Sequence, residues 1–479
     1  MAEYVPTIGL EIHAELRTRT KMFCDSLNDP DETRPNTNVC PVCLGHPGAL
    51  PTMNRDAIAS VIKVGLALGG DIAPVSKFDR KNYFYPDLPK AYQISQYDQP
   101  LVTHGELLGI RIRRIHLEED TGTLVHEHGA SLADFNRAGV PLMELVTEPD
   151  IHDAETAVRF AKEFQLILRA LGVSDANMEK GQMRVEVNLS VAKPGAKEFG
   201  TKVEVKNINS FKAVEGAILH EIRRHTDLLE SGKGSEIVQE TRGWDDAKRA
   251  TVGQRSKENA HDYRYFPEPD LPPFSTAPFG LDEMKRALPE LPAAKRTRLQ
   301  AEFGLSRPQA DQLVEEPSLA DFYEAAASEL AEREEDEREG KAGRAEAQRL
   351  LFNYLTTDLK ALGDPAASKV APEHFAHLVD LIADKKITSR QAKDLLAEMH
   401  ASGADPETIM GDRGMALVSD EGALIETVRA VIAAQPKAVA DYKAGKEASL
   451  QFLVGQAMKV LKGQGEPNAL RGLFKKELG

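Results

Sequence analysis

The chain has 479 residues, of which 75 are acidic and 60 basic, giving a formal net charge of −15. Hydrophobic residues make up 41 % and charged residues 28 %, which is typical of globular proteins and not of disordered or fibrous ones. No apolar stretch approaches the roughly 20 residues that span a bilayer, and no leader-like pattern opens the chain. Its three cysteines indicate a reducing compartment. We therefore expect a cytoplasmic protein without membrane contact.

The first part of the chain alternates between strand and helix patterns. Polar and apolar residues alternate with period 2, as in half-covered antiparallel strands, over residues 8–17, 183–191 and 201–206. Helical spacing covers residues 55–68, 153–171 and about 210–229, and the second of these has Asp153 as a cap and ends at Gly172. Because no regular β-α-β order appears, we predict an α+β fold with a largely antiparallel sheet and flanking helices.

After about residue 280 the sequence is rich in Ala, Leu, Glu and Lys with helical spacing. The Pro-rich segment 265–273 interrupts both helix and central strand, and a second break falls near residues 401–406. We predict three domains: a mixed cradle domain over 1–290, a helical domain over 291–405, and a helical tail over 406–479.

The common nucleotide-binding and hydrolase motifs are absent from the sequence: there is no GxxxxGK[ST] loop, no GxGxxG after a strand, and no GxSxG elbow. Glu11 and His13, two residues apart, would share one strand face, where a carboxylate and an imidazole can bind a divalent ion. An exposed polar sheet face is the alternative.

An acidic run follows at residues 116–120 (HLEED). Alternation alone would put His116, Glu118 and Asp120 on one face and Glu119 on the other. Such a run either holds cations or is a solvated turn.

Residues 77–96 combine basic and aromatic side chains with two prolines. Cations such as Lys81 and Lys90 suit phosphate, and aromatic rings suit bases, although a packed loop would have the same composition.

The three cysteines include a CxxC pair, Cys40 and Cys43, with Cys24 upstream. Structural zinc, free thiols and a redox pair all remain open, and zinc needs a fourth ligand such as Asp25, His46, another side chain or water. Near the C-terminus, a local basic patch suits an RNA backbone, with ordinary solubilising residues as the alternative. The patch consists of Lys459, Lys462, Arg471, Lys475 and Lys476.

Several long motifs together resemble a known family, the B subunits of aspartyl/glutamyl-tRNA amidotransferases. These motifs are 8–13 (IGLEIH), 77–87 (KFDRKNYFYPD), 116–120 (HLEED), 262–270 (DYRYFPEPD) and 452–456 (FLVGQ). The resemblance implies a heterotrimer with a larger amidase partner, which releases ammonia from glutamine, and a small third partner; the cognate aminoacyl-tRNA synthetase is a further candidate partner. The B subunits of this family bind misacylated Asp-tRNA(Asn) or Glu-tRNA(Gln), phosphorylate the side-chain carboxylate with ATP and Mg²⁺, and let ammonia displace the phosphate.

The resemblance also implies roles for individual residues. Glu11, His13 and Glu119 match metal-site positions, so here the resemblance selects Glu119 where alternation selects Glu118. Lys81 is carried over as a catalytic residue. Lys90 and Arg184 are further expected nucleotide contacts, together with Glu186 and Asn188, which share the polar sheet face with Glu11 and His13. Zinc-binding members have a CxC pair before the CxxC, whereas this chain has only Cys24 followed by Asp25.

The helical middle and tail resemble tRNA-facing modules. Two other functions compete with that of an amidotransferase component: a zinc-stabilised RNA-binding module without catalysis, and a ligase of the glutamine-synthetase type that acts on a free amino acid. Whether Asp-tRNA(Asn), Glu-tRNA(Gln) or both are used stays open.

Overall fold

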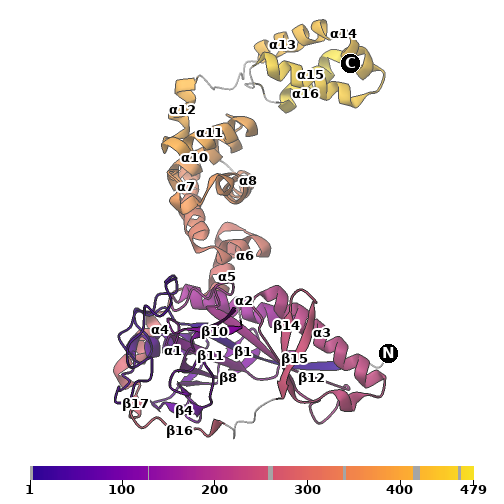
Figure 1. The fold of residues 1–479 in the computed structure, drawn as a ribbon. Helices are drawn as coiled ribbons and strands as arrows, with labels where there is room; N and C mark the ends of the chain where they lie inside the picture. The colour runs from indigo at the N-terminus through magenta and orange to yellow at the C-terminus, as the bar shows by residue number, and fades with distance from the viewer. Residues whose placement is uncertain are drawn as a thin grey trace. The chain divides into compact units, whose positions relative to one another are not determined.

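In the computed structural model, the first part of the chain forms a long sheet flanked by helices, and the later part forms helices (Figure 1). The structure describes residues 4–127, 129–256, 263–337, 341–413, 421–461, 465 and 467–479. They form two compact units, Met1–Ala294 and Lys295–Gly479. The predicted α+β class is confirmed, while the three-domain division remains a prediction.

The first unit contains the strands. They are β1 (Val5–Glu15), β2 (Asp71–Ile72), β3 (Val75–Ser76), β4 (Asp79–Asn82), β5 (Tyr92–Ser95), β6 (Val102–Thr103), β7 (Glu106–Leu107), β8 (Ile110–Glu119), β9 (Thr123–Glu127), β10 (Ala130–Asp134), β11 (Pro141–Thr147), β12 (Met183–Ala192), β13 (Val203–Lys206), β14 (Glu240–Asp245), β15 (Ala250–Ser256), β16 (Phe266–Pro267) and β17 (Phe274–Ser275). Its α-helices are α1 (Arg55–Ala67), α2 (Ala154–Ala170), α3 (Phe211–Glu230) and α4 (Leu281–Arg286).

The main sheet has the strand order β15-β14-β13-β12-β1-β11-β8-β6-β2, with β7 paired to β8. Its pairings are antiparallel except for the parallel pair β13–β14. Because side chains alternate along β1, Ile8, Leu10 and Ile12 enter the hydrophobic core and the polar residues between them face the other way. The strands predicted over 8–17, 183–191 and 201–206 are therefore present as β1, β12 and β13.

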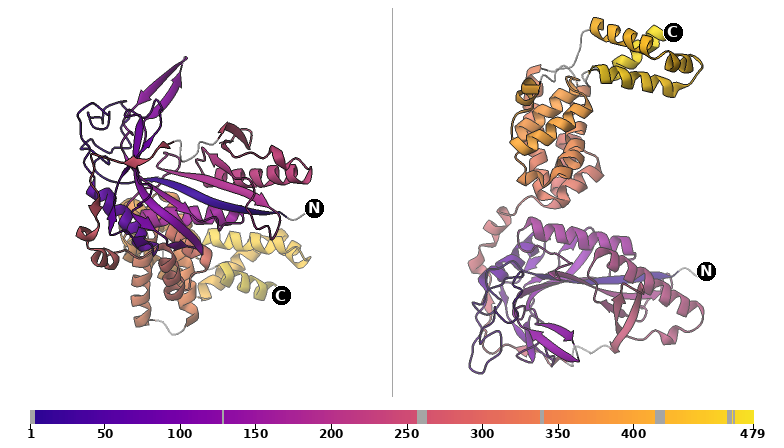
Figure 2. Two further views of the ribbon diagram at one scale, coloured as in Figure 1. Left: turned by 90° about the horizontal axis from the view of Figure 1, so that it is seen from below. Right: turned by 45° about the horizontal axis from the view of Figure 1, so that its top comes forward.

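The predicted helices are also present, as α1, α2 and α3. Asp153 caps α2 by accepting a hydrogen bond from the Thr156 backbone N–H at 2.7 Å, and Gly172 follows its end with a φ of 66°. The fully buried Phe160 and Phe164 of α2 pack into the core with α3 and the sheet. Helices α2 and α3 lie along the same face of the sheet (Figure 2), so the opposite face carries the polar side chains.

The second unit consists of helices, the first of which, α5, begins just before it. They are α5 (Pro292–Phe303), α6 (Arg307–Glu315), α7 (Pro317–Glu337), α8 (Lys341–Asn353), α9 (Lys360–Leu362), α10 (Pro372–Ala383), α11 (Ser389–Ser402), α12 (Pro406–Arg413), α13 (Glu421–Ala434), α14 (Pro436–Lys443), α15 (Glu447–Val460) and α16 (Pro467–Leu478), with a π-helical stretch at Tyr354–Leu359. The last four helices share a hydrophobic core that includes Val428, Leu453 and Phe474. Among the helices described, none combines the length and apolar character needed to cross a bilayer.

Candidate active site

Strand pairing gathers polar side chains on the face of the sheet opposite α2 and α3. In β1, Glu11 and His13 point to this face, since the residues between and beside them are core residues. His13 lies opposite Glu144 of β11 on one side and opposite Arg184 of β12 on the other. Glu144 in turn lies opposite His116 of β8. Four neighbouring strands thus each contribute a titratable side chain at one level of the sheet.

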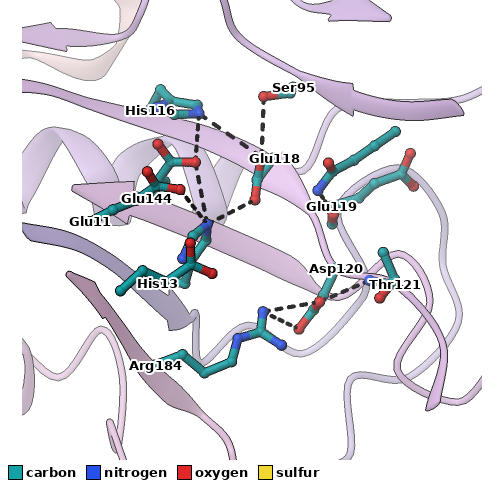
Figure 3. Close-up of polar contacts among 12 residues, drawn as sticks. Glu11, His13, Ser95, His116, Glu118, Glu119, Asp120, Thr121, Glu144 and Arg184 are labelled. Carbon is teal, nitrogen blue, oxygen red and sulfur yellow. Dashed lines mark hydrogen bonds and ion pairs between the residues drawn. The ribbon is translucent and has the colours of Figure 1, made fainter. Parts of the chain in front are cut away.

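His13 stands at the centre of a carboxylate cluster (Figure 3). Its Nε2 lies 3.3 Å from Glu144 Oε2, 3.6 Å from Glu118 Oε1 and 3.8 Å from Glu11 Oε1. His116 Nε2 lies 3.5 Å from the same oxygen of Glu144. We call these five residues, Glu11, His13, His116, Glu118 and Glu144, the carboxylate–histidine cluster.

Burial and crowded negative charge shift the pKa values in this cluster. Burial, with the charges of Glu144 and Glu186, raises the pKa of Glu11 to about 7. Burial alone would lower the pKa of His13, but its contact with the Glu144 carboxylate raises that pKa to about 9. Burial lowers the pKa of His116 to about 4. Without a metal ion, a protonated His13 supplies the positive charge that these carboxylates need, and a bound cation would replace its proton.

The donor set of the cluster fits a divalent cation. One ligand atom from each of Glu11, His13 and Glu144 lies within 4.8 Å of the others, and the same holds for His116, Glu118 and Glu144. Hard cations such as Mg²⁺ prefer carboxylate oxygens, and imidazole joins them at transition-metal sites. His13 Nδ1 is buried without a hydrogen-bond partner, so no structural bond from this atom fixes the orientation of the ring in the described structure.

The structure does not bring Glu119 to Glu11 and His13, and Glu118 stands there instead. The register of β8 with β11 is unbroken from Arg114 to Glu119, so Glu118 shares the face of His116, while Glu119 points away (Figure 3). Lys90 Nζ lies 2.5 Å from Glu119 Oε2, and the Ile94 backbone N–H donates to its Oε1 at 2.9 Å. The position of Glu118 therefore follows alternation, while metal binding by Glu119, which the resemblance implies, stays a prediction. Because Lys90 pairs with Glu119, its ammonium group does not lie in the carboxylate–histidine cluster.

Two expected cations do lie beside the cluster. Lys81 of β4 lies with its Nζ 5.0 Å from the ring centre of Tyr263, and Glu118 is the foremost of the charges that raise its pKa against the effect of burial. Arg184 donates to both carboxylate oxygens of Asp120 at 3.2 Å. Asp120 follows the end of β8, which separates it from the alternating residues before it.

Glu186 and Asn188 of β12 extend the polar face on the side of Glu11. Lys206 Nζ lies 2.6 Å from Glu186 Oε2, and Glu186 forms a further carboxylate group with Glu11 and Glu204. Asn188 Oδ1 is a buried acceptor without a hydrogen-bond partner. Next to them is a cavity of about 340 Å³, whose lining includes Glu11, Arg113, Arg114, Asn188, Lys202 and Phe199.

The three cysteines come together. Their sulfur atoms lie within 4.8 Å of one another, so the group could hold a metal ion. Cys40 Sγ and Cys43 Sγ are 3.8 Å apart, and the buried Lys21 places its Nζ 3.9 Å from Cys43 Sγ. Neither Asp25 nor His46 joins this group within the described residues. A hydrogen bond with Cys24, together with Lys21, lowers the pKa of Cys43 to about 4.

The basic residues expected in the tail lie on α15 and α16. Lys459, Arg471, Lys475 and Lys476 are exposed there, and Lys462 lies outside the described residues. Their role as RNA contacts remains a prediction.

Sequence reasoning missed Glu144, which contacts both histidines of the cluster. Arg114 Nη2 also lies 3.4 Å from Glu144 Oε1. The only signal was a single acid in the apolar run Pro141–Thr147, which is a buried strand. A buried acid in such a run needs partners, and those of Glu144 all come from other strands.

Comparisons with known proteins agree with this architecture. Residues 6–278 match the family model described as the GatB/GatE catalytic domain, and residues 335–478 match the model described as the GatB domain. A protein of Carboxydothermus hydrogenoformans is 44 % identical over 100 % of this chain and 99 % of its own length, and it is named as the B subunit of aspartyl/glutamyl-tRNA(Asn/Gln) amidotransferase. The chain belongs to this family. Relatives of the same name from Thermomicrobium roseum and Dehalococcoides mccartyi are each 45 % identical, over 99 % and 100 % of the chain.

The first family match spans the whole carboxylate–histidine cluster, and the second includes the basic residues of α15 and α16. The amidotransferase B-subunit family therefore covers both parts of the chain in which sequence reasoning expected function.

Proposed function

We propose that this chain activates and amidates the side-chain carboxylate of Asp or Glu carried by misacylated tRNA(Asn) or tRNA(Gln). The observation that carries the proposal is the carboxylate–histidine cluster with its adjoining cavity on one sheet face. Family membership adds to this support, because the relatives' shared name describes one component of such an amidotransferase.

The chemistry explains why such a cluster is needed. A carboxylate is a poor acceptor for ammonia, since it has no good leaving group. Transfer of the γ-phosphoryl group of ATP to a carboxylate oxygen releases ADP and creates one. Ammonia then attacks the carbonyl carbon, inorganic phosphate leaves, and the surplus proton passes to a base. Phosphoryl transfer depends mainly on positioning and on neutralising negative charge.

The residues of this chain suit those tasks. Glu11, His13 and Glu144 would hold Mg²⁺, which when bound would neutralise charge on the transferring phosphoryl group. Arg114 lines the neighbouring cavity and would bind the phosphates of ATP, with Lys81 close to the carboxylates. Glu118 and Glu144 are only 3 % and 5 % exposed, so the site keeps water away from a hydrolysable acyl phosphate.

The chain needs partners for the complete reaction. Its cysteines stand in the Cys24–Cys40–Cys43 group, and ammonia would come from the amidase partner, with the small third partner completing the heterotrimer. Structural Zn²⁺ would occupy the cysteine group, and the cytoplasm would be the compartment. The cognate aminoacyl-tRNA synthetase is a further partner to test.

The decisive experiment measures labelled ADP released by the heterotrimer with misacylated tRNA, uncharged tRNA or free glutamate. We expect ADP only with misacylated tRNA. Glu144→Gln, which keeps the side-chain shape, should lower that rate at least 100-fold with tRNA affinity unchanged, whereas the exposed Glu198→Gln should change neither.

Other outcomes would contradict the proposal. Absence of tRNA-stimulated ATP cleavage would favour an RNA-binding module, and cleavage with free glutamate alone would indicate a ligase of the glutamine-synthetase type. A Glu144→Gln variant with full activity would remove the cluster from the chemistry.

A further inference from the structure

A second hollow lies on the helix side of the first unit, away from the carboxylate–histidine cluster. It has a volume of about 420 Å³ and lies between α3 and the hairpin of β14 and β15. Helix α3 packs directly against β15. Figure 1 shows α3 beside β14 and β15, which form one end of the main sheet. We call this feature the α3 hollow.

A glycine and the single tryptophan of the chain shape the α3 hollow. A Cβ atom on Gly216 would come within 2.9 Å of the Trp244 ring, so glycine lets the indole lie close against α3. The Trp244 Nε1–H donates a hydrogen bond to Asp246 Oδ1 at 2.7 Å, which fixes the indole ring as one wall of the hollow. The hollow is therefore a built feature of the fold.

Charges of both signs line the hollow: the acids are Glu215 and Asp246, of which Asp246 accepts the hydrogen bond of Trp244, and the cations outnumber them. Lys212 and Arg223 on α3 and Arg249 in the hairpin turn line the hollow, and all three are exposed. In the described part of the chain, none of them has a carboxylate partner. Exposed arginines elsewhere in the same unit are paired with acids: Arg111 and Arg113 each have a nitrogen 2.7 Å from a carboxylate oxygen. Three unpaired cations around one hollow stand out in a chain whose net charge is −15.

The spacing of these cations points to an extended polyanion. Residues 212 and 223 are eleven positions apart on one continuous helix, which corresponds to about 16 Å along its axis. Positions 212, 216, 220 and 223 follow the i, i+4 and i+3 spacing of one helix face. A single phosphate cannot contact cations so far apart, whereas a chain of phosphodiesters can. Ser210 caps the start of α3, whose free N–H groups add positive potential there.

We propose that the α3 hollow is a contact site for the phosphodiester backbone of the tRNA substrate, separate from the basic residues of α15 and α16. The inference rests on the proposed function, because that function supplies tRNA as the substrate. The hollow takes backbone phosphates through Lys212, Arg223 and Arg249, and thus reads position rather than base sequence.

The test compares two triple variants of the full-length chain that remove equal charge. The first is Lys212→Gln, Arg223→Gln and Arg249→Gln. The control is Lys63→Gln, Lys193→Gln and Lys285→Gln, three exposed positions outside the lining of the hollow. We expect the first variant to weaken tRNA binding at least tenfold, and to reduce the slope of log K against log salt concentration by about two to three. Equal effects of both variants would overturn the proposal.

Trp244 gives an independent signal, since it is the only tryptophan. Its fluorescence should change when tRNA is added and should not change with ATP alone. A response to ATP with none to tRNA would make the hollow a nucleotide site and would overturn the proposal.

Kinetics in the heterotrimer separate this inference from the proposed function. The first triple variant should keep kcat for tRNA-dependent ATP cleavage at saturating tRNA while KM for tRNA rises about tenfold. Glu144→Gln should show the opposite pattern. If wild-type protein binds tRNA through the hollow but never cleaves ATP, the proposed function fails and the contact site stands.

Discussion

Glu11→Gln should make the metal-free protein more stable at alkaline pH, although it removes a candidate ligand. Glu11 has a pKa of about 7 in the folded chain against an ordinary value of 4.5, and its side chain is 24 % exposed. Because the pKa of this carboxyl is higher in the folded chain than in the unfolded chain, the unfolded chain loses the proton at a lower pH. Stability is therefore lost as pH rises from 4.5 through 7.

The size of the effect follows from those two values. A shift of about 2.5 pKa units corresponds to roughly 3 kcal/mol at pH 8, where both states are ionised, and to less than about 1 kcal/mol at pH 5. Gln keeps the shape without the charge, so it removes this cost. For a unit of the size of Met1–Ala294, about 3 kcal/mol corresponds to a rise of roughly 5 °C in melting temperature.

Thermal melts at pH 5 and pH 8, with and without Mg²⁺ or Mn²⁺, provide the assay. At pH 8 without metal, Glu11→Gln should melt higher than wild type, and the gain should nearly vanish at pH 5. Metal should stabilise the wild type and leave the variant unchanged. The exposed Glu198→Gln is the control. A variant that melts lower than wild type at pH 8 would refute the argument that crowded carboxylates strain this site.

Three further changes test other parts of the chain. Lys81→Met removes the half-buried cation whose charge acts on Glu118 and should lower kcat for tRNA-dependent ATP cleavage about 100-fold, measured against Lys63→Met; equal rates would exclude a role for this charge. Cys43→Ser should reduce the zinc content, measured by mass spectrometry, from about one to near zero per chain and lower the melting temperature; zinc-free wild type would contradict a zinc site. Deletion of residues 407–479 should weaken tRNA binding at least tenfold in a gel shift, with co-purification of the amidase partner retained; unchanged binding would leave the tail without a role in it.

Much of the first unit could be predicted because local patterns decide it. Alternation in β1 separates Ile8, Leu10 and Ile12 from Glu11 and His13, and no distant residue is needed to see which face is buried. Asp153 and Gly172 mark the ends of α2 by rules that depend on neighbouring backbone groups.

The centre of the site could not be predicted so readily, since it depends on strand order. Glu144 contacts His13 because β11 pairs with β1, and contacts His116 because β8 pairs with β11. Neither strand pairing can be predicted from the sequence of a single segment. The same alternation that found β1 also put Glu118 on the face of His116, and the regular register from Arg114 to Glu119 places it there. The α3 hollow depends on helix and hairpin packing around Gly216 and was not expected from the sequence.

Metal and nucleotide binding at the carboxylate–histidine cluster can be tested by a crystal structure with Mn²⁺ and a non-hydrolysable ATP analogue, in which anomalous scattering locates the metal. We predict a peak bound by Glu11, His13 and Glu144, with the nucleotide in the cavity beside Arg114 and Asn188. Metal and nucleotide bound together elsewhere in the chain would contradict the account.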